Sequence, residues 1–185
     1  MNKIWKALTA AVFCLSLVIP GFSKADASIK LAVVPLIIGE EVEDDAGLKP
    51  IAYSTEVSEL FQYPEYDMVD SDKVRKAALA QQDKLFTKEG LTAVAKETGA
   101  DCVVAMSIDH FEVKEDNLRR EPVTSLYFSG VFATINMAKN SYKEDKYRFR
   151  DEMESGAIHP KYDYPHHRFQ YLCKRELNKA IKNNK

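Results

Sequence analysis

The chain has 185 residues, 45% of them hydrophobic, and its 26 lysines and arginines nearly balance 28 aspartates and glutamates, for a formal net charge of −2. This length is enough for one domain with a sizeable core and too short for two comfortable ones. Nucleic-acid-binding proteins normally carry a basic patch, whereas charges of both signs are interspersed here, so we expect no nucleic-acid partner.

Residues 1–27 have the pattern of a cleaved signal peptide. Lys3 and Lys6 precede an apolar run over residues 7–19, and Ala25-Asp26-Ala27 supplies the small residues that a signal peptidase reads. The run is shorter than the roughly 20 residues that span a bilayer, which argues against the alternative of a retained membrane anchor. Cys14 lies inside this run and is not placed for lipid attachment. We expect an exported protein, periplasmic or extracellular, with no stable membrane insertion after cleavage.

Residues 28–185 are predicted to form a single α/β domain. Segments rich in β-branched and aromatic residues indicate strands, and apolar residues at i, i+3, i+4 and i+7 indicate helices. Strands are expected at residues 29–38, 66–70, 102–113, 123–138 and 146–153, and helices at 50–61, 71–81, 87–98 and 165–181. The order β-α-β-α-α-β-β-β-α predicts an α/β (α+β) fold with a mixed β-sheet and helices packed on it.

Local signals refine these elements. Asp70 or Ser71 is expected to cap the helix that follows, and Gly99 suits a left-handed helix C-terminus. Gly130 is a candidate β-bulge within its strand. In the strand over residues 102–113, His110 alternates with Met106 and Ile108, which predicts one face for all three.

Two cysteines lie in the predicted domain. Cys102 opens an apolar strand and Cys173 lies on the apolar face of the last helix, so both are expected to face the core. An oxidising compartment would allow a Cys102–Cys173 disulfide, and the alternative is two buried free thiols. The chain has no CxxC redox motif.

One cluster has metal-ligand residue types, namely His159, His166 and His167. Imidazoles of this kind bind zinc or copper, which makes the three histidines a candidate metal site. Their spacing matches no metal motif, and adjacent histidines point apart, so the alternative is a polar loop leading into a helix. The tyrosines nearby make a rim for another ligand a further alternative.

Catalytic signatures are absent from the sequence. It contains no glycine-rich phosphate loop, no HExxH and no EF-hand pattern. Ser129 lacks the flanking glycines of a nucleophile elbow, and a lone histidine such as His110 is more often a rim or core residue. The aromatic residues Tyr127, Phe128, Phe132, Tyr147 and Phe149 are predicted to be sheet core. We therefore assign no catalytic residue and no cofactor, and favour a protein that is not an enzyme.

Three segments carry a resemblance to a known type of domain. They are Lys30-Leu31-Ala32-Val33-Val34-Pro35, the strand and helix between Tyr66 and Leu79, and the helix-Gly-Ala-Asp-strand sequence from Leu91 to Val104. This pattern resembles the α/β domain shared by the amino-terminal domain of the periplasmic Tol translocation protein, the curli secretion lipoprotein and lipoprotein activators of penicillin-binding proteins. The resemblance implies a non-enzymatic envelope domain that engages other proteins, and it transfers no catalytic residue.

The leading hypothesis from the sequence is an exported, non-enzymatic cell-envelope accessory or protein-interaction domain whose partner is another envelope protein. The alternative is a metal or small-ligand binding protein that uses the region of His159, His166 and His167. A hydrolase with a noncontiguous site is the least favoured of the three hypotheses. The sequence assigns no oligomeric state.

Overall fold

The computed structural model describes residues 28–42, 47–116, 123–154 and 163–184. The predicted order of elements is confirmed, but the strands predicted over 29–38 and 102–113 are each divided in two. In chain order the elements are β1 (Ile29–Val33), β2 (Ile37–Ile38), α2 (Leu48–Thr55), the π-helical turn η2 (Glu56–Leu60), β3 (Tyr66–Met68), α3 (Ser71–Leu79), the 3-10 turn η3 (Gln82–Lys84), α4 (Lys88–Thr98), β4 (Cys102–Ile108), β5 (His110–Asp116), β6 (Val123–Asn136), β7 (Ser141–Glu154) and α5 (Asp163–Asn184).

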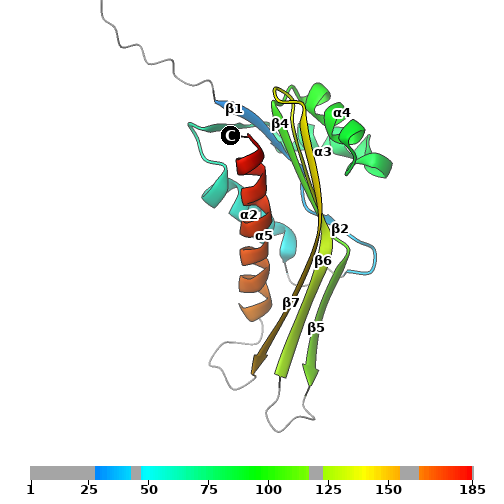
Figure 1. The fold of residues 1–185 in the computed structure, drawn as a ribbon, viewed down its shortest axis with the longest axis vertical. Helices are drawn as coiled ribbons and strands as arrows, with labels where there is room; N and C mark the ends of the chain where they lie inside the picture. The colour runs from blue at the N-terminus through cyan, green and yellow to red at the C-terminus, as the bar shows by residue number, and fades with distance from the viewer. Residues whose placement is uncertain (1–27, 43–46, 117–122, 155–162, 185) are drawn as a thin grey trace, which may run out of the picture.

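The described strands form a mixed seven-stranded sheet that is not closed into a barrel. β1 lies between β3 and β4 and is parallel to both. β6 is 14 residues long; its C-terminal half pairs with β4, and its N-terminal half pairs with β5. β7 pairs with β6 along its whole length. The portion made by β5, β6 and β7 extends beyond the region that α3 and α4 cover (Figure 1).

Helices cover both faces of the sheet around β1. α2 and α5 pack on one face, and α3 and α4 pack on the other (Figure 1). Alternate residues of β1 divide between these layers: Leu31 and Val33 enter the core under α2 and α5, whereas Ala32 and Val34 enter the core under α3 and α4. A strand covered on both faces needs apolar residues at every position, which explains the continuous apolar run in the sequence.

The predicted helix caps are confirmed. The Asp70 carboxylate accepts a hydrogen bond from the backbone N–H of Lys73 at 3.0 Å, so Asp70 and not Ser71 caps α3. Gly99 ends α4 with φ of 73°, a left-handed conformation that glycine adopts without a steric penalty. These caps determine where α3 begins and where α4 ends.

A β-bulge separates β4 from β5. Met106 pairs with Phe132 and His110 pairs with Ser129, so three residues, 107–109, lie opposite only two, 130–131. The extra residue reverses which face each side chain occupies. The predicted shared face of His110 with Met106 is therefore wrong: Met106 lies in the core on the α5 side, and His110 faces the opposite side.

Gly130 is not itself the bulged residue, which corrects the prediction for β6. It pairs regularly with Tyr147, and the additional residue belongs to the neighbouring strand. A Cβ atom at position 130 would lie 2.0 Å from the carbonyl oxygen of Ser107 and 2.6 Å from the Tyr147 hydroxyl. Glycine is present here because the bulged backbone approaches β6 too closely for any side chain.

Candidate functional site

The three-stranded ribbon made by β5 and the facing parts of β6 and β7 has two different faces. One face packs against α5: Phe128 stacks near Phe111 and Phe149, and the ring of Phe169 from α5 meets Phe128 edge-on at 5.8 Å. On the other face no helix of the described residues lies over the ribbon (Figure 1). We call this second face the open face.

The strand register arranges the side chains of the open face in rows across the three strands. The rows are His110, Ser129 and Arg148; then Glu112, Tyr127 and Arg150; then Lys114, Ser125 and Glu152. Lys146 adjoins the first row because it pairs with Val131. Side chains directly opposite one another on adjacent strands interact, so each row acts as a unit.

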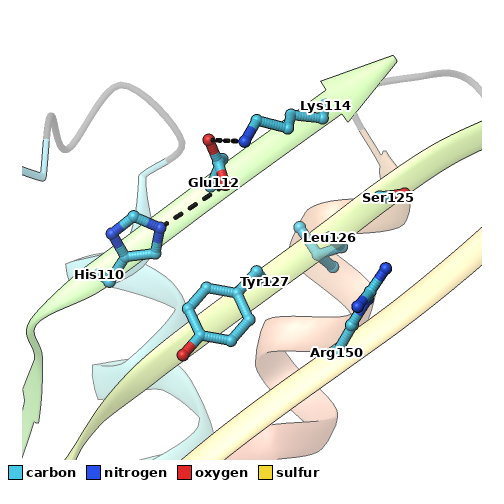
Figure 2. Close-up of a pocket in the computed structure, with 7 residues that line it drawn as sticks. All are labelled: His110, Glu112, Lys114, Ser125, Leu126, Tyr127 and Arg150. Carbon is cyan, nitrogen blue, oxygen red and sulfur yellow. Dashed lines mark ion pairs between the residues drawn. The ribbon is translucent and has the colours of Figure 1, made fainter. Parts of the chain in front are cut away.

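Figure 2 shows the centre of the open face, a shallow hollow of about 390 Å³. The His110 and Tyr127 rings lie 5.1 Å apart, and His110 Nε2 lies 3.7 Å from a Glu112 carboxylate oxygen. Lys114 Nζ lies 2.7 Å from the other oxygen of Glu112, and its hydrogen bond lowers the pKa of Glu112 below its ordinary value. Glu112 therefore contacts both His110 and Lys114, its neighbours on the β5 part of this face.

By the strand register the open face carries charges of both signs. Glu112 is paired with Lys114, and Glu152 is paired with Arg150 at 2.9 Å. Lys146 and Arg148 are exposed, and neither has an ion-pair partner among the described residues. Exposed cations on the same face as an aromatic ring favour contact with an acidic group.

The structure brings together two residues that sequence reasoning treated separately. Ser129 and His110 are direct cross-strand partners on the open face. No hydrogen bond joins their side chains in the described structure, and His110 lies against Tyr127 and Glu112 instead. A serine nucleophile needs a base within hydrogen-bond reach, and the described contacts of His110 do not supply one to Ser129.

The predicted histidine cluster is only partly described. His166 and His167 lie in α5 and line a shallow depression of about 220 Å³ with Ile51, Ser54 and Gln170. His159 lies outside the described residues. Within the described ranges no group of three metal-binding side chains is found. The metal site thus stays a prediction.

Cys102 and Cys173 are free thiols in the structure, both fully buried in the core between the sheet and α5. Burial raises the pKa of Cys102 to about 11 and holds that of Cys173 well above its ordinary value. The expected core positions are thus found, and the thiolate, which is the reactive form, is disfavoured at both.

Four of the five predicted core aromatics contact the core on the α5 side. Phe128, Phe132 and Tyr147 are buried, and Phe149 is partly buried against them. Tyr127 is the exception, because its position on β6 places it on the open face. It is the aromatic residue of the candidate site, and the sequence pattern did not distinguish it from its neighbours.

Comparison with known proteins finds similar folds and no relative in sequence. No family model matches the chain, and no curated protein is similar to it. The hypothetical protein CT253 from Chlamydia trachomatis is 13% identical, with a TM-score of 0.47, over 85% of this chain and 94% of that one. The lipoprotein GNA1162 from Neisseria meningitidis is 11% identical, with a TM-score of 0.46, over 83% and 99%. LpoB from Escherichia coli is 12% identical, with a TM-score of 0.41, over 69% and 58%.

The resemblance to lipoprotein activators of penicillin-binding proteins is confirmed as a shared arrangement of elements, since LpoB is among the similar structures. In the part of the chain that the structure describes, no helix is long and apolar enough to cross a membrane.

Proposed function

We propose that this chain is an exported, non-enzymatic accessory protein of the cell envelope that binds an acidic segment of another envelope protein on its open face. The observation that carries the proposal is the pair of exposed cations, Lys146 and Arg148, which have no ion-pair partner among the described residues and lie on the same face as Tyr127. The signal-peptide pattern of residues 1–27 supports the envelope location.

Charge and shape both favour an extended acidic segment. The rows run across three strands, so a chain lying over the first row meets His110, Ser129 and Arg148 in turn. Tyr127 lies in the next row. Arginine forms bidentate hydrogen bonds with carboxylates, and the tyrosine ring offers apolar area at a low entropic cost. Such a contact weakens as salt is added, because the charges are exposed.

The test measures binding of two synthetic peptides, one rich in glutamate and one rich in lysine, by fluorescence anisotropy. We expect the acidic peptide alone to bind, and the double charge reversal Lys146→Glu with Arg148→Glu to abolish its binding. The matched control is Lys96→Glu with Lys88→Glu, which reverses two exposed charges on α4 and leaves the open face intact. Equal binding of both peptides, or binding unaffected by the open-face reversal, would overturn the proposal.

A photoreactive amino acid tests the same face in cells. Placed at Ser125 on the open face, it is expected to crosslink one envelope protein, and placed at Glu97 on α4 it is not. The crosslink should disappear with the open-face charge reversal. Equal crosslinking from both positions, or turnover of a small substrate by the purified protein, would contradict a non-enzymatic binding role.

A further inference from the structure

Another hollow lies where the parallel strands β1 and β3 end. β1 leads to α2 on one face of the sheet, whereas β3 leads to α3 on the other. In open α/β sheets, ligands usually bind beyond the carboxyl ends of the parallel strands. This chain has a groove of about 690 Å³ there.

The groove is lined mostly by apolar side chains. They come from the end of β1, from α2 with the turn η2, and from the end of β3, and they are Val33, Pro35, Pro50, Tyr53, Val57 and Met68. Tyr53 is 59% exposed, a large apolar surface for a residue beside a groove. A ligand of matching shape would bury that surface.

One ionisable side chain in the groove is buried. Glu56 is only 4% exposed, and its side chain lines the groove. Its carboxyl makes no hydrogen bond or ion pair with any described residue. Buried polar groups are normally satisfied, so an unpartnered carboxyl beside an open groove calls for a partner that comes from outside the chain.

The local backbone explains how Glu56 reaches this position. It begins the π-helical turn η2, in which the N–H of Phe61 donates to the carbonyl oxygen of Glu56 at 2.9 Å. A π turn adds one residue relative to an α-helical turn and rotates the side chains on either side of it. Burial raises the pKa of Glu56 to about 8, so the carboxyl is mostly protonated at neutral pH.

The other titratable groups near Glu56 come from three elements. Cys173 approaches from α5, Lys49 and Tyr53 lie on α2, and Asp70 lies at the start of α3. Asp70 is exposed at the groove rim and adds a second carboxylate there. The groove therefore combines a mostly apolar lining with two acidic residues, the buried Glu56 and the exposed Asp70.

We propose that this groove binds a small apolar molecule that carries one primary amine, with the ammonium group against the Glu56 carboxyl. The ammonium supplies the three donors that the carboxyl lacks, and its charge compensates the carboxylate within the buried site. Binding then transfers the Glu56 proton to solvent: the carboxylic acid and the ammonium ion become an ion pair, and one proton is released. The site is separate from the open face and does not depend on it.

The experiment titrates phenethylamine and its neutral counterpart 2-phenylethanol into the protein, with binding followed by NMR. We expect shifts at groove residues and about tenfold tighter binding of the amine, because a charge-assisted hydrogen bond exceeds a neutral one by roughly 1.4 kcal/mol. In Glu56→Gln, which keeps the shape and removes the charge, the preference should vanish. Calorimetry in two buffers of different ionisation enthalpy should show nearly one proton released on amine binding.

Tyr53→Ala gives a second variant, since it removes exposed apolar area from the groove and should weaken both probes equally. Equal affinity of amine and alcohol for the unmodified protein would overturn the proposal. The same holds if the preference for the amine survives in Glu56→Gln, or if the shifts fall outside the groove.

Discussion

The buried carboxyl of Glu56 predicts an unusual dependence of stability on pH. Its pKa is about 8 in the folded protein, against 4.5 ordinarily, and desolvation is the cause. Because the folded pKa is raised, the protonated acid favours folding. Its contribution is fully present below pH 4.5 and is lost as pH rises toward 8.

The free energy of unfolding should therefore fall, relative to the Glu56→Gln variant, by about 1.4 kcal/mol for each pH unit across this window. Between pH 4.5 and neutral pH the accumulated difference is about 3 kcal/mol. That corresponds to a relative shift of roughly 6–12 °C in Tm for a chain of this size.

The assay is urea unfolding of both proteins, followed by circular dichroism in steps from about pH 4.5 to pH 8. The difference between the two proteins cancels the titration of all other groups. Glu59→Gln is the matched control: Glu59 lies in the same turn, but its hydrogen bond with Lys174 lowers its pKa, so it should show no slope in this window. A flat difference between wild type and Glu56→Gln would show that the carboxyl is ionised in the folded state and refute the reasoning.

Three further predictions concern the fold. Gly130→Ala should destabilise the protein by about 3 kcal/mol in urea unfolding, because the added Cβ overlaps the bulged backbone. Cys102 and Cys173 should react with a thiol reagent only after unfolding, as mass spectrometry can follow, because both are buried with raised pKa values. Thr87→Ala should cost about 1 kcal/mol by leaving the N–H of Gly90 without its cap at the start of α4.

Two of these predictions have a control substitution at a nearby residue, which separates the named cause from a general effect of mutation. Ser129 is next to Gly130 in the chain, and its side chain lies on the open face. Ser129→Ala should therefore change stability little. Thr92→Ala lies inside α4, where its hydroxyl donates to a backbone carbonyl that is already part of the helix, so no orphan donor results. Thiols that react at the same rate with and without urea would contradict the burial of the cysteines.

The fold was predictable where an element is determined by residues close to it in the sequence. The doubly covered strand β1 shows as an unbroken apolar run, and α4 shows as helical periodicity closed by Gly99. The Asp70 cap needs only its own side chain and the next turn. Such signals lie within a few residues of the structure that they specify.

The bulge was not predictable, because it is a relation between two strands. Nothing in the sequence around Ser107 and Asp109 shows that β6 offers one residue fewer opposite them. The face of every β5 side chain depends on that count, so the assignment of His110 failed with it. The sequence predicts a bulge at Gly130 in β6, whereas the extra residue lies on the neighbouring strand, between β4 and β5.

Both candidate sites escaped sequence reasoning for a similar reason. The residues of the open face, such as Tyr127 and Arg148, are ordinary strand residues until the register aligns them. Glu56 looks like a surface residue of a helix, and only the π turn and the packing of α5 make it buried. The sequence shows which side chains are charged or polar, whereas segments far along the chain determine which of those side chains are exposed.

The continuity of β6 has a mechanical consequence. Its 14 residues run without a break from the doubly covered core to the far end of the ribbon, and β7 accompanies it throughout. A pull on a bound partner along the strand direction would load all of these backbone hydrogen bonds in shear at once, with no hinge between the binding surface and the core. A load applied along β6 would therefore be shared with β7 and carried into the core as if the two strands were one stiff ribbon.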